Sequence, residues 1–360
     1  MLMKFLRLAL NLLVICICVA TALPFIKTDQ WWIRIFDFPR LQFFLLGIAI
    51  LVLYAFAVRR PRTINKGFIG ILGVALVVQA WQIFPYTPLA SRQVKAAENN
   101  DDALTIFAAN VLQENRNAAD LIRQIKENNP DLILLTEADD WWTDQLRELE
   151  ISHPHTLLHP RTNTYGMNLY SKVELIEPEV RFLVEPEIPS IRAKLKTRNH
   201  RTIHFYGVHP RPPALEPPGK DEKLDSTQRD AELIVIGKEV SRISAPVIVA
   251  GDFNDVAWSH TTRLFLRTSR LLDPRVGRGL YNSFNAKNLF FRYPLDHLFH
   301  SDHFTLLQIE RLKYFGSDHF PIMVKINLEP EAAMVQEAPP KKPADTEEAE
   351  KILQRSQQKD

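Results

Sequence analysis

The distribution of apolar and polar residues divides the chain into two unlike parts. The first 90 residues are dominated by three long runs without a charged side chain, at residues 8–26, 41–58 and 67–90. Each run is close to the roughly 20 residues that a helix needs to cross a bilayer. From residue 103 onward, apolar residues come in short runs between polar turns, which is typical of strands and amphipathic helices. We therefore predict three transmembrane helices in a membrane anchor at 1–90, a linker at 91–102 and a folded domain at 103–328.

The periodicity within the folded domain predicts both kinds of element. Helices are indicated where apolar residues recur at helical spacing, at residues 117–129, 141–150, 225–243 and 259–268. Short apolar or alternating runs predict strands at 104–111, 131–138, 165–171, 180–184, 191–197, 202–208, 247–251, 295–300, 306–314 and 322–326. Residues 329–360 combine several prolines with mixed charges, and we predict that this tail is disordered.

Polar side chains follow several of these strands at the point where each strand ends. The clearest case is the run VIVAGDFND at 247–255, in which a buried strand stops at Gly251 and Asp252 and Asn254 follow. Open α/β sheets place their sites at the carboxyl ends of strands. A single Asp or His in such a place is more commonly a turn former, so the ordered set of strand ends carries the interpretation.

Six motifs at these strand ends resemble the endonuclease/exonuclease/phosphatase superfamily of metal-dependent phosphoesterases. The resemblance covers about residues 103–328, and GDFN followed by SDHFP is its most specific part. It implies an α+β fold, a four-layer α/β/β/α sandwich of two packed mixed β-sheets flanked by helices. Leu112 departs from the pattern, because repair nucleases usually carry an acidic residue two positions after the first Asn. The motifs are AAN at 108–110, LLTE at 134–137, VHP at 208–210, GDFN at 251–254, LDH at 295–297 and SDHFP at 317–321.

The resemblance implies a divalent metal held by oxygen ligands. Glu137 matches the position of a direct ligand, and Asn110 and Asp318, with Asp252 and Asn254, would complete or flank one or two metal positions. Carboxylate and amide oxygens suit Mg²⁺, and we expect Mn²⁺ to substitute for it.

The same resemblance implies roles in acid-base chemistry. Asp296 would pair with His319, which would contact the phosphate or help to activate the attacking water. His209 would bind the phosphate or assist the leaving group. Asp252 would orient or deprotonate the water while Asn254 donates a hydrogen bond to the phosphate, and the general base stays open between Asp252 and His319.

Other candidate side chains are weaker. Tyr165 precedes a strand that resembles one lining the family's cleft, so it is a possible substrate contact. His153, His155 and His159 resemble a metal cluster by number alone, without a strand end to support them. His297 follows Asp296 on a predicted strand, so its side chain should point to the opposite face and serve the structure.

Basic residues predict the orientation of the anchor. The loop between the second and third runs holds Arg59, Arg60, Arg62 and Lys66 and no acidic residue. Such a loop usually stays in the cytoplasm, which would put the folded domain on the periplasmic or extracytoplasmic side of a bacterial inner membrane. A cleaved signal peptide is the alternative for the first run, although two further apolar runs favour an uncleaved anchor. Aromatic anchors are predicted at the outer interface, at Trp31, Trp32, Trp81 and Tyr86.

Charge and cysteine content narrow the class of partner. Residues 1–66 carry nine Lys or Arg against two Asp or Glu, and with a whole-chain charge of +2 the remaining residues are mildly acidic. This argues against a dedicated nucleic-acid binder with a broad basic face. The only cysteines, Cys16 and Cys18, lie in the first apolar run, so the folded domain has no thiolate ligands for zinc.

The sequence thus predicts a membrane-anchored, Mg²⁺-dependent phosphoesterase of the nuclease type, acting on phosphodiester or phosphomonoester bonds. Its partners would be the lipid bilayer and a phosphate-ester substrate, nucleic acid or lipid head group, and no protein partner is predicted. A phospholipid or sphingolipid head-group phosphodiesterase is the alternative within the fold. A membrane-tethered binding protein without turnover is the alternative from another class, supported only by Leu112.

Overall fold

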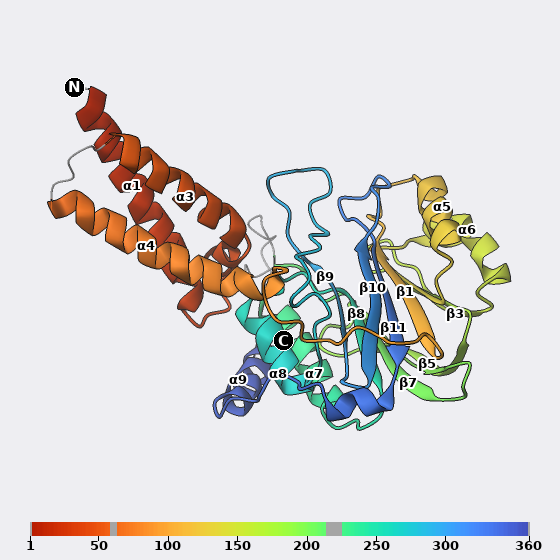
Figure 1. Cartoon of the computed structure of the whole chain (residues 1–360). Helices are drawn as coiled ribbons and strands as arrows, with labels where there is room; N and C mark the ends of the chain where they lie inside the picture. Colours follow the sequence, from red (N-terminus) through yellow and green to blue (C-terminus); the bar gives the residue numbers. More distant parts are fainter. Residues whose placement is uncertain (1, 58–62, 214–224, 359–360) are drawn as a thin grey trace.

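The structure is a computed structural model that describes residues 2–57, 63–213 and 225–358. Figure 1 shows a bundle of long helices extending from one side of an α/β domain. The basic loop at 59–62 and most of the proline-rich segment after His209 lie outside the described residues.

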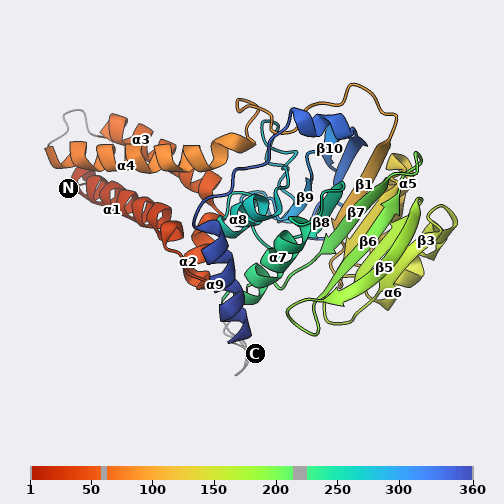
Figure 2. The same cartoon turned by 90° about the horizontal axis from the view of Figure 1, so that it is seen from below.

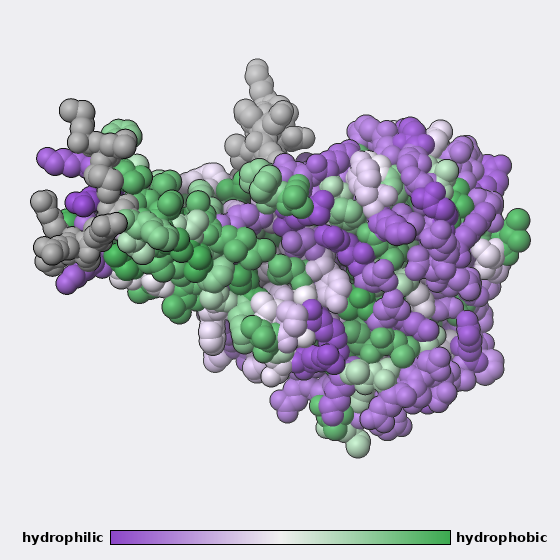
Figure 3. Space-filling view, turned by 45° about the horizontal axis from the view of Figure 1, so that its top comes forward, coloured by the Kyte–Doolittle hydropathy of each residue, from purple (hydrophilic) through white to green (hydrophobic). Residues whose placement is uncertain are grey.

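The bundle contains the three predicted hydrophobic runs as helices α1 (Leu2–Ala22), α3 (Arg40–Ala57) and α4 (Thr63–Ile83). In the described residues, α1 and α4 are each long and apolar enough to cross a membrane. A third span exists only if α3 and the preceding helical segment, bent by 67° relative to each other, count as one. The prediction of three separate spans is therefore supported for two. Figure 3 shows that the apolar surface is concentrated on this bundle.

Between α1 and α3 the chain forms a short connecting segment of η1 (Leu23–Phe25), α2 (Trp31–Arg34) and η2 (Ile35–Asp37). This segment packs on the α/β domain. Of the four predicted aromatic anchors, Trp32 and Trp81 are exposed, while Trp31 and Tyr86 are buried. Tyr86 lies in η3 (Phe84–Tyr86), and its hydroxyl donates to the carbonyl of Ala257 at 2.9 Å. Half of the predicted interface anchors therefore attach the bundle to the domain.

The domain contains two mixed sheets. The six-stranded sheet has the order β10-β11-β1-β2-β4-β3, and the five-stranded sheet has the order β5-β6-β7-β8-β9. Each sheet holds one parallel pair, β1 with β2 and β7 with β8. The strands are β1 (Ala103–Asn110), β2 (Leu132–Thr136), β3 (His155–His159), β4 (Met167–Ser171), β5 (Glu174–Phe182), β6 (Pro189–Lys196), β7 (Thr202–Val208), β8 (Val247–Asp252), β9 (Asp296–His300), β10 (Phe304–Arg311) and β11 (Ile322–Leu328).

Helices cover the outer faces of both sheets, which gives the predicted four layers (Figure 2). α5 (Ala118–Asn128) and α6 (Asp140–Gln145), followed by η4 (Arg147–Ile151), pack on the six-stranded sheet. α7 (Thr227–Val240) and α8 (His260–Ser269) pack on the five-stranded sheet. The main core lies between the sheets, where apolar side chains such as Leu134, Phe205 and Ile248 are fully buried.

Local signals explain where these helices begin and end. The side chain of Asn117 accepts from the backbone N–H of Asp120 at the start of α5, and Asn129 ends the helix in the left-handed conformation. Ser259 caps α8 in the same way as Asn117 caps α5. β3 was not predicted, because its sequence, HTLLH, does not alternate apolar and polar residues.

The prediction of a disordered tail is wrong for the last part of the chain. Residues 330–334 form η5 (Pro330–Met334), and α9 (Asp345–Gln357) packs on α7 and α8. Ala349 is buried against Ile234 and Leu264. Arg267 donates to both carboxylate oxygens of Asp345, at 2.8 and 2.9 Å. The sequence of α9 is mostly polar, and its narrow apolar face is buried only through contact with the folded domain.

The linker is also part of the fold. Val94 is fully buried between the sheets, and residues beside it exchange backbone hydrogen bonds with Leu306 of β10. The connection between bundle and domain is therefore short and packed.

Candidate active site

The candidate site lies where the two sheets present the ends of their central strands. Asn110 ends β1, Glu137 follows β2, His209 follows β7 and Asp252 ends β8. Asp296 begins β9 and pairs directly with Asp252, because β8 and β9 are antiparallel. Both sheets therefore contribute to one cluster, which is what the strand-end motifs predict.

Backbone geometry at the strand ends requires particular residues. Gly251 has φ +140°, and a Cβ atom there would lie 2.0 Å from the carbonyl oxygen of Val208. Only glycine permits this close approach of β7 and β8, which brings His209 next to Asp252. Glu137 and Asn254 have positive φ values of 61° and 51°, an unfavourable conformation that is concentrated at functional sites.

The side-chain amide of Asn110 joins two carboxylates, those of the half-buried Glu137 and the buried Asp252. Its Nδ2 donates to Glu137 Oε1 at 2.7 Å and to Asp252 Oδ2 at 3.1 Å. Burial raises the pKa of Glu137 to about 7, and burial also raises the pKa of Asp252. Two carboxylates withdrawn from water and close together favour a cation between them.

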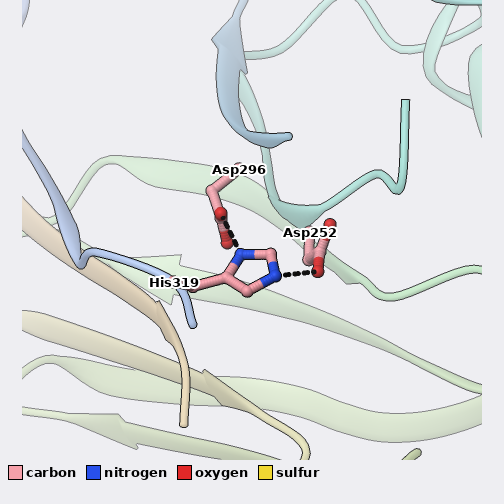
Figure 4. Close-up of side chains that lie close together, drawn as sticks. All are labelled: Asp252, Asp296 and His319. Carbon is pink, nitrogen blue, oxygen red and sulfur yellow. Dashed lines mark hydrogen bonds and ion pairs between the residues drawn. The ribbon is translucent and has the colours of Figure 1, made fainter. Parts of the chain in front are cut away.

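His319 lies between the carboxylates of Asp296 and Asp252 (Figure 4). Its Nδ1 is 2.6 Å from Asp296 Oδ2, and its Nε2 is 3.6 Å from Asp252 Oδ2. Burial lowers the pKa of His319, but Asp296 and Asp252 outweigh burial and raise it to about 10. The ring is therefore an imidazolium that donates to Asp296.

The donor set fits a hard divalent cation. Glu137 Oε2 receives only a long hydrogen bond of 3.4 Å from the backbone of Gln113, so it keeps the capacity to bind a metal. Asp252, Asp296 and His319 form the one group of three potential ligands in the described residues, with ligand atoms within 4.8 Å of one another. Because both ring nitrogens of His319 already face carboxylates, proton sharing accounts for that group better than metal binding.

His209 faces the same carboxylates from β7. Its Nε2 is 3.9 Å from Asp252 Oδ2 and 4.0 Å from Glu137 Oε1. Burial lowers its pKa, so this imidazole is neutral. The ring of Tyr165 lies 5.5 Å from that of His209, which places this predicted substrate contact beside the site.

Asn254 and Asp318 complete the predicted set. The backbone N–H of Asn254 donates to Asp252 Oδ1 at 2.9 Å, and its Nδ2 donates to the carbonyl of Pro210 at 3.0 Å. One hydrogen of that amide thus holds the loop after β7. Asp318 lies close enough for its charge to raise the pKa of both Glu137 and His319.

Some residues of the site were not predicted. Ser317 Oγ donates to the carbonyl of Asn110 at 2.8 Å and accepts from the backbone N–H of His319 at 3.0 Å. The ring of Phe284 lies 4.9 Å from that of His319. Ser317 could have been noticed as a member of the SDHFP motif, whereas no local pattern marks Phe284.

The anchor itself supports the loop after β8. Arg34 in α2 donates to Asp230 Oδ2 at 2.8 Å and to Asp255 Oδ2 at 3.1 Å. Arg229 donates to the carbonyl of Asn254 at 2.7 Å and lies 3.2 Å from Asp255. All of these side chains except that of Asn254 are buried. A cation from the segment between α1 and α3 therefore underlies the loop that carries Asp252 and Asn254.

His297 and His153 have structural surroundings. His297 Nε2 is 2.8 Å from the carbonyl of Asp255, and its ring stacks on Phe299, as predicted for a residue on the opposite face of β9. His153 Nε2 is 3.0 Å from the carbonyl of Pro130. His153, His155 and His159 form no metal-binding group in the described part of the chain.

Comparison with known proteins identifies the family. The model of the Endonuclease/Exonuclease/phosphatase family matches residues 107–319, more than half of the chain. No curated protein matches. The catalytic domain of human Nocturnin with bound sulfate is 14% identical, with a TM-score of 0.51 over 63% of this chain and 95% of its own.

Two bacterial structures described as endonuclease/exonuclease/phosphatase are also similar. That from Bacteroides vulgatus is 15% identical, with a TM-score of 0.50 over 63% of this chain and 99% of its own. That from Beutenbergia cavernae is 14% identical, with a TM-score of 0.50 over 63% of this chain and 72% of its own. At this identity the structures support the fold. The chain belongs to the endonuclease/exonuclease/phosphatase family, whose members are divalent-metal-dependent hydrolases of phosphoester bonds.

Proposed function

We propose that the chain is a membrane-anchored, Mg²⁺-dependent phosphoesterase that hydrolyses phosphodiester bonds, or phosphomonoester bonds, by metal-assisted attack of water. The observation that carries the proposal is the convergence of Glu137, Asn110, Asp252 and His319 from both sheets onto one cluster. Two helices long and apolar enough to cross a membrane support the anchoring. No protein partner is required by this scheme.

The chain's own residues would hold the metal in the following way. Glu137 and Asp252 would supply carboxylates, Asn110 orients both of them by donating from Nδ2 while its Oδ1 accepts from the backbone N–H of Leu112, and Asp318 adds negative charge nearby. When bound, Mg²⁺ or Mn²⁺ would neutralise charge on the phosphate and lower the pKa of water.

The proton-carrying groups then take separate roles. His319 is protonated, so it is suited to contact a phosphate oxygen, and Asp296 fixes its orientation. A protonated ring is not a base, which favours Asp252 as the group that orients or deprotonates the water. His209 would bind the phosphate or assist the leaving group, Asn254 would donate a hydrogen bond to the phosphate, and Tyr165 would contact the substrate.

The substrate class has two candidates, nucleic acid and a lipid head group. The mildly acidic composition after residue 66 does not supply a broad basic face for nucleic acid. The anchor would keep the site next to lipid. A binding protein without turnover is the third possibility, but every main catalytic position holds a suitable side chain, and Leu112 alone departs from the family pattern.

The test uses the full chain in lipid nanodiscs, because the anchor contributes Arg34 to the domain. We expect hydrolysis of bis(p-nitrophenyl) phosphate that requires Mg²⁺ and stops in excess chelator. Glu137→Gln and Asp252→Asn should each lower kcat by about a hundredfold or more without changing the unfolding temperature by more than a few degrees. Undiminished turnover in chelator, or in both variants, would refute the proposal.

A further inference from the structure

A loop next to the site exposes three consecutive large apolar side chains. Leu289, Phe290 and Phe291 are 70%, 77% and 56% exposed. The exposed Lys287 precedes them and Arg292 follows them. Soluble surfaces rarely expose such a contiguous apolar patch, whereas an apolar tip between cations is typical of segments that enter a membrane interface. We call residues 286–292 the apolar loop.

The apolar loop contacts the membrane anchor. Gln42, in the first turn of α3, donates from Nε2 to the carbonyl of Phe290 at 2.6 Å. Leu45 and Leu46 are exposed on the same helix. At a rise of about 1.5 Å per residue they lie roughly 5 Å further along the helix than Gln42. The tip of the apolar loop is therefore at the depth where α3 would enter the bilayer. Figure 1 shows the chain before β9 rising beside the bundle.

The other end of the apolar loop contacts the site. The backbone N–H of Ala286 donates to the carbonyl of Asp318 at 2.6 Å. Asn285 donates to the carbonyl of Phe291 at 3.0 Å and closes the base of the loop. Phe284, just before it, packs against the ring of His319. One short segment thus connects His319 with helix α3 of the bundle.

We propose that the apolar loop inserts into the bilayer that holds the anchor, and that the site takes its substrate from this bilayer, as a phospholipid with a phosphodiester head group. This inference rests on the proposed function. The exposed Lys287 would lie near the lipid phosphates, where a cation favours an anionic surface, whereas the guanidinium of Arg292 packs over the ring of Phe320. Hydrolysis needs only water, which supplies the oxygen of the new phosphomonoester and the proton of the released alcohol.

The activity test uses the full chain reconstituted in vesicles of phosphatidylcholine and phosphatidylglycerol, with bis(p-nitrophenyl) phosphate as the soluble substrate. Phe290→Ser with Phe291→Ser should lower hydrolysis of the vesicle lipid by about tenfold or more, because the variant lacks the two apolar side chains that would be buried in the bilayer. Turnover of the soluble ester should not change. The matched control is Ile151→Ser, which alters an apolar side chain that is 90% exposed in η4. It should change neither rate.

Three outcomes overturn the inference. In the first, the wild-type protein hydrolyses the soluble ester or DNA but no vesicle lipid. In the others, the double variant loses both activities equally, or Ile151→Ser has the same effect as the double variant. Absence of activity on every substrate would instead refute the proposed function.

A second test does not depend on activity. Cys16 and Cys18 are the only cysteines and are replaced by Ala, and a spin label is attached at Phe290→Cys or, as control, at Ile151→Cys. In the vesicles, the label at 290 should be relaxed more by oxygen than by a water-soluble nickel complex, and the label at 151 should behave oppositely. Equal exposure of both labels to the nickel complex would show that the apolar loop stays in water.

Discussion

The two imidazoles of the site are held in opposite charge states by their surroundings. His319 has a carboxylate at each ring nitrogen, so the raised pKa keeps it protonated. His209 is buried without such a close carboxylate, and its pKa is lowered. One site therefore offers a cationic hydrogen-bond donor and a neutral ring, which can take different roles at the same phosphate.

Replacement of Asp296 tests the first of these roles. Asp296→Asn keeps the size of the side chain but removes the charge that orients and stabilises the His319 imidazolium. We expect kcat to fall by roughly a hundredfold, with a smaller change in KM. Steady-state kinetics on the soluble diester measures both values. An equally large loss in Asp302→Asn, an acid outside the site, would indicate a general effect of charge.

A buried acid away from the site gives a prediction about pH. Glu232 in α7 is 3% exposed, and burial, with the nearby charge of Glu185, raises its pKa to about 8. The folded state therefore favours the protonated form, and the carboxyl group costs more stability as pH rises from the unfolded value near 4.5 to about 8. Glu232→Gln should remove this loss.

Chemical unfolding at two pH values measures the effect. Relative to wild type, Glu232→Gln should gain about 2 to 4 kcal/mol of unfolding free energy at pH ~8 and little at pH ~4.5. Glu239→Gln, on the same helix, should act in the opposite direction, since hydrogen bonds from Arg181 and Arg192 lower the pKa of Glu239 despite its burial. A gain that is independent of pH would contradict the assignment.

At the scale of elements, α2 belongs to the site as much as to the anchor. Its Arg34 is buried between Asp230 and Asp255, beneath the loop that follows β8. Removing one member of a buried ionic cluster leaves the other charges uncompensated, which costs far more than breaking an exposed pair.

Arg34→Met should therefore destabilise the domain by about 3 kcal/mol and lower kcat, because Asp252 and Asn254 lose support. The matched control is Lys27→Met, which removes another cation of the same segment. Lys27 pairs with Glu348 at 2.9 Å but is largely exposed, so its loss should cost less than about 1 kcal/mol. The unfolding free energy and kcat of the two variants are measured side by side. Equal effects of Arg34→Met and Lys27→Met would contradict a supporting role of Arg34 beneath the site.

The elements also show what a sequence can reveal about this fold. Strand ends with Asn110, Glu137, His209 and Asp252 were found because parallel strands place consecutive motifs at one edge of each sheet. Arg34 and Phe284 were missed, since their contacts join segments far apart in the chain and no local pattern marks them. Helix α9 was missed for the same reason, because its apolar face is stabilised by packing on Ile234 and Leu264, which are distant in the sequence.

On the scale of the whole molecule, one end is the apolar helix bundle and the other is the polar α/β domain. Figure 3 shows the boundary between the two surfaces, and the apolar loop lies on the side of the bundle. If the basic loop between α3 and α4 faces the cytoplasm, the domain and the C-terminus face the opposite side.

A fusion at the C-terminus tests this orientation. Alkaline phosphatase attached after Asp360 should be active in bacterial cells, and green fluorescent protein at the same place should be dark, because each reporter matures on one side of the membrane only. Replacing the four basic residues of the loop at 59–66 by Gln should weaken the preference. A fluorescent wild-type fusion would reverse the proposed location.

The tether between bundle and domain has almost no slack. Tyr86 is fixed to Ala257 at one end, Val94 is held in the core at the other, and only residues 87–93 lie between them. If the bundle spans a bilayer as proposed, this short connection keeps the site at a fixed distance from the membrane surface. A lipid substrate would then reach the site by lateral diffusion in two dimensions, whereas a soluble ester would reach it from the bulk solution.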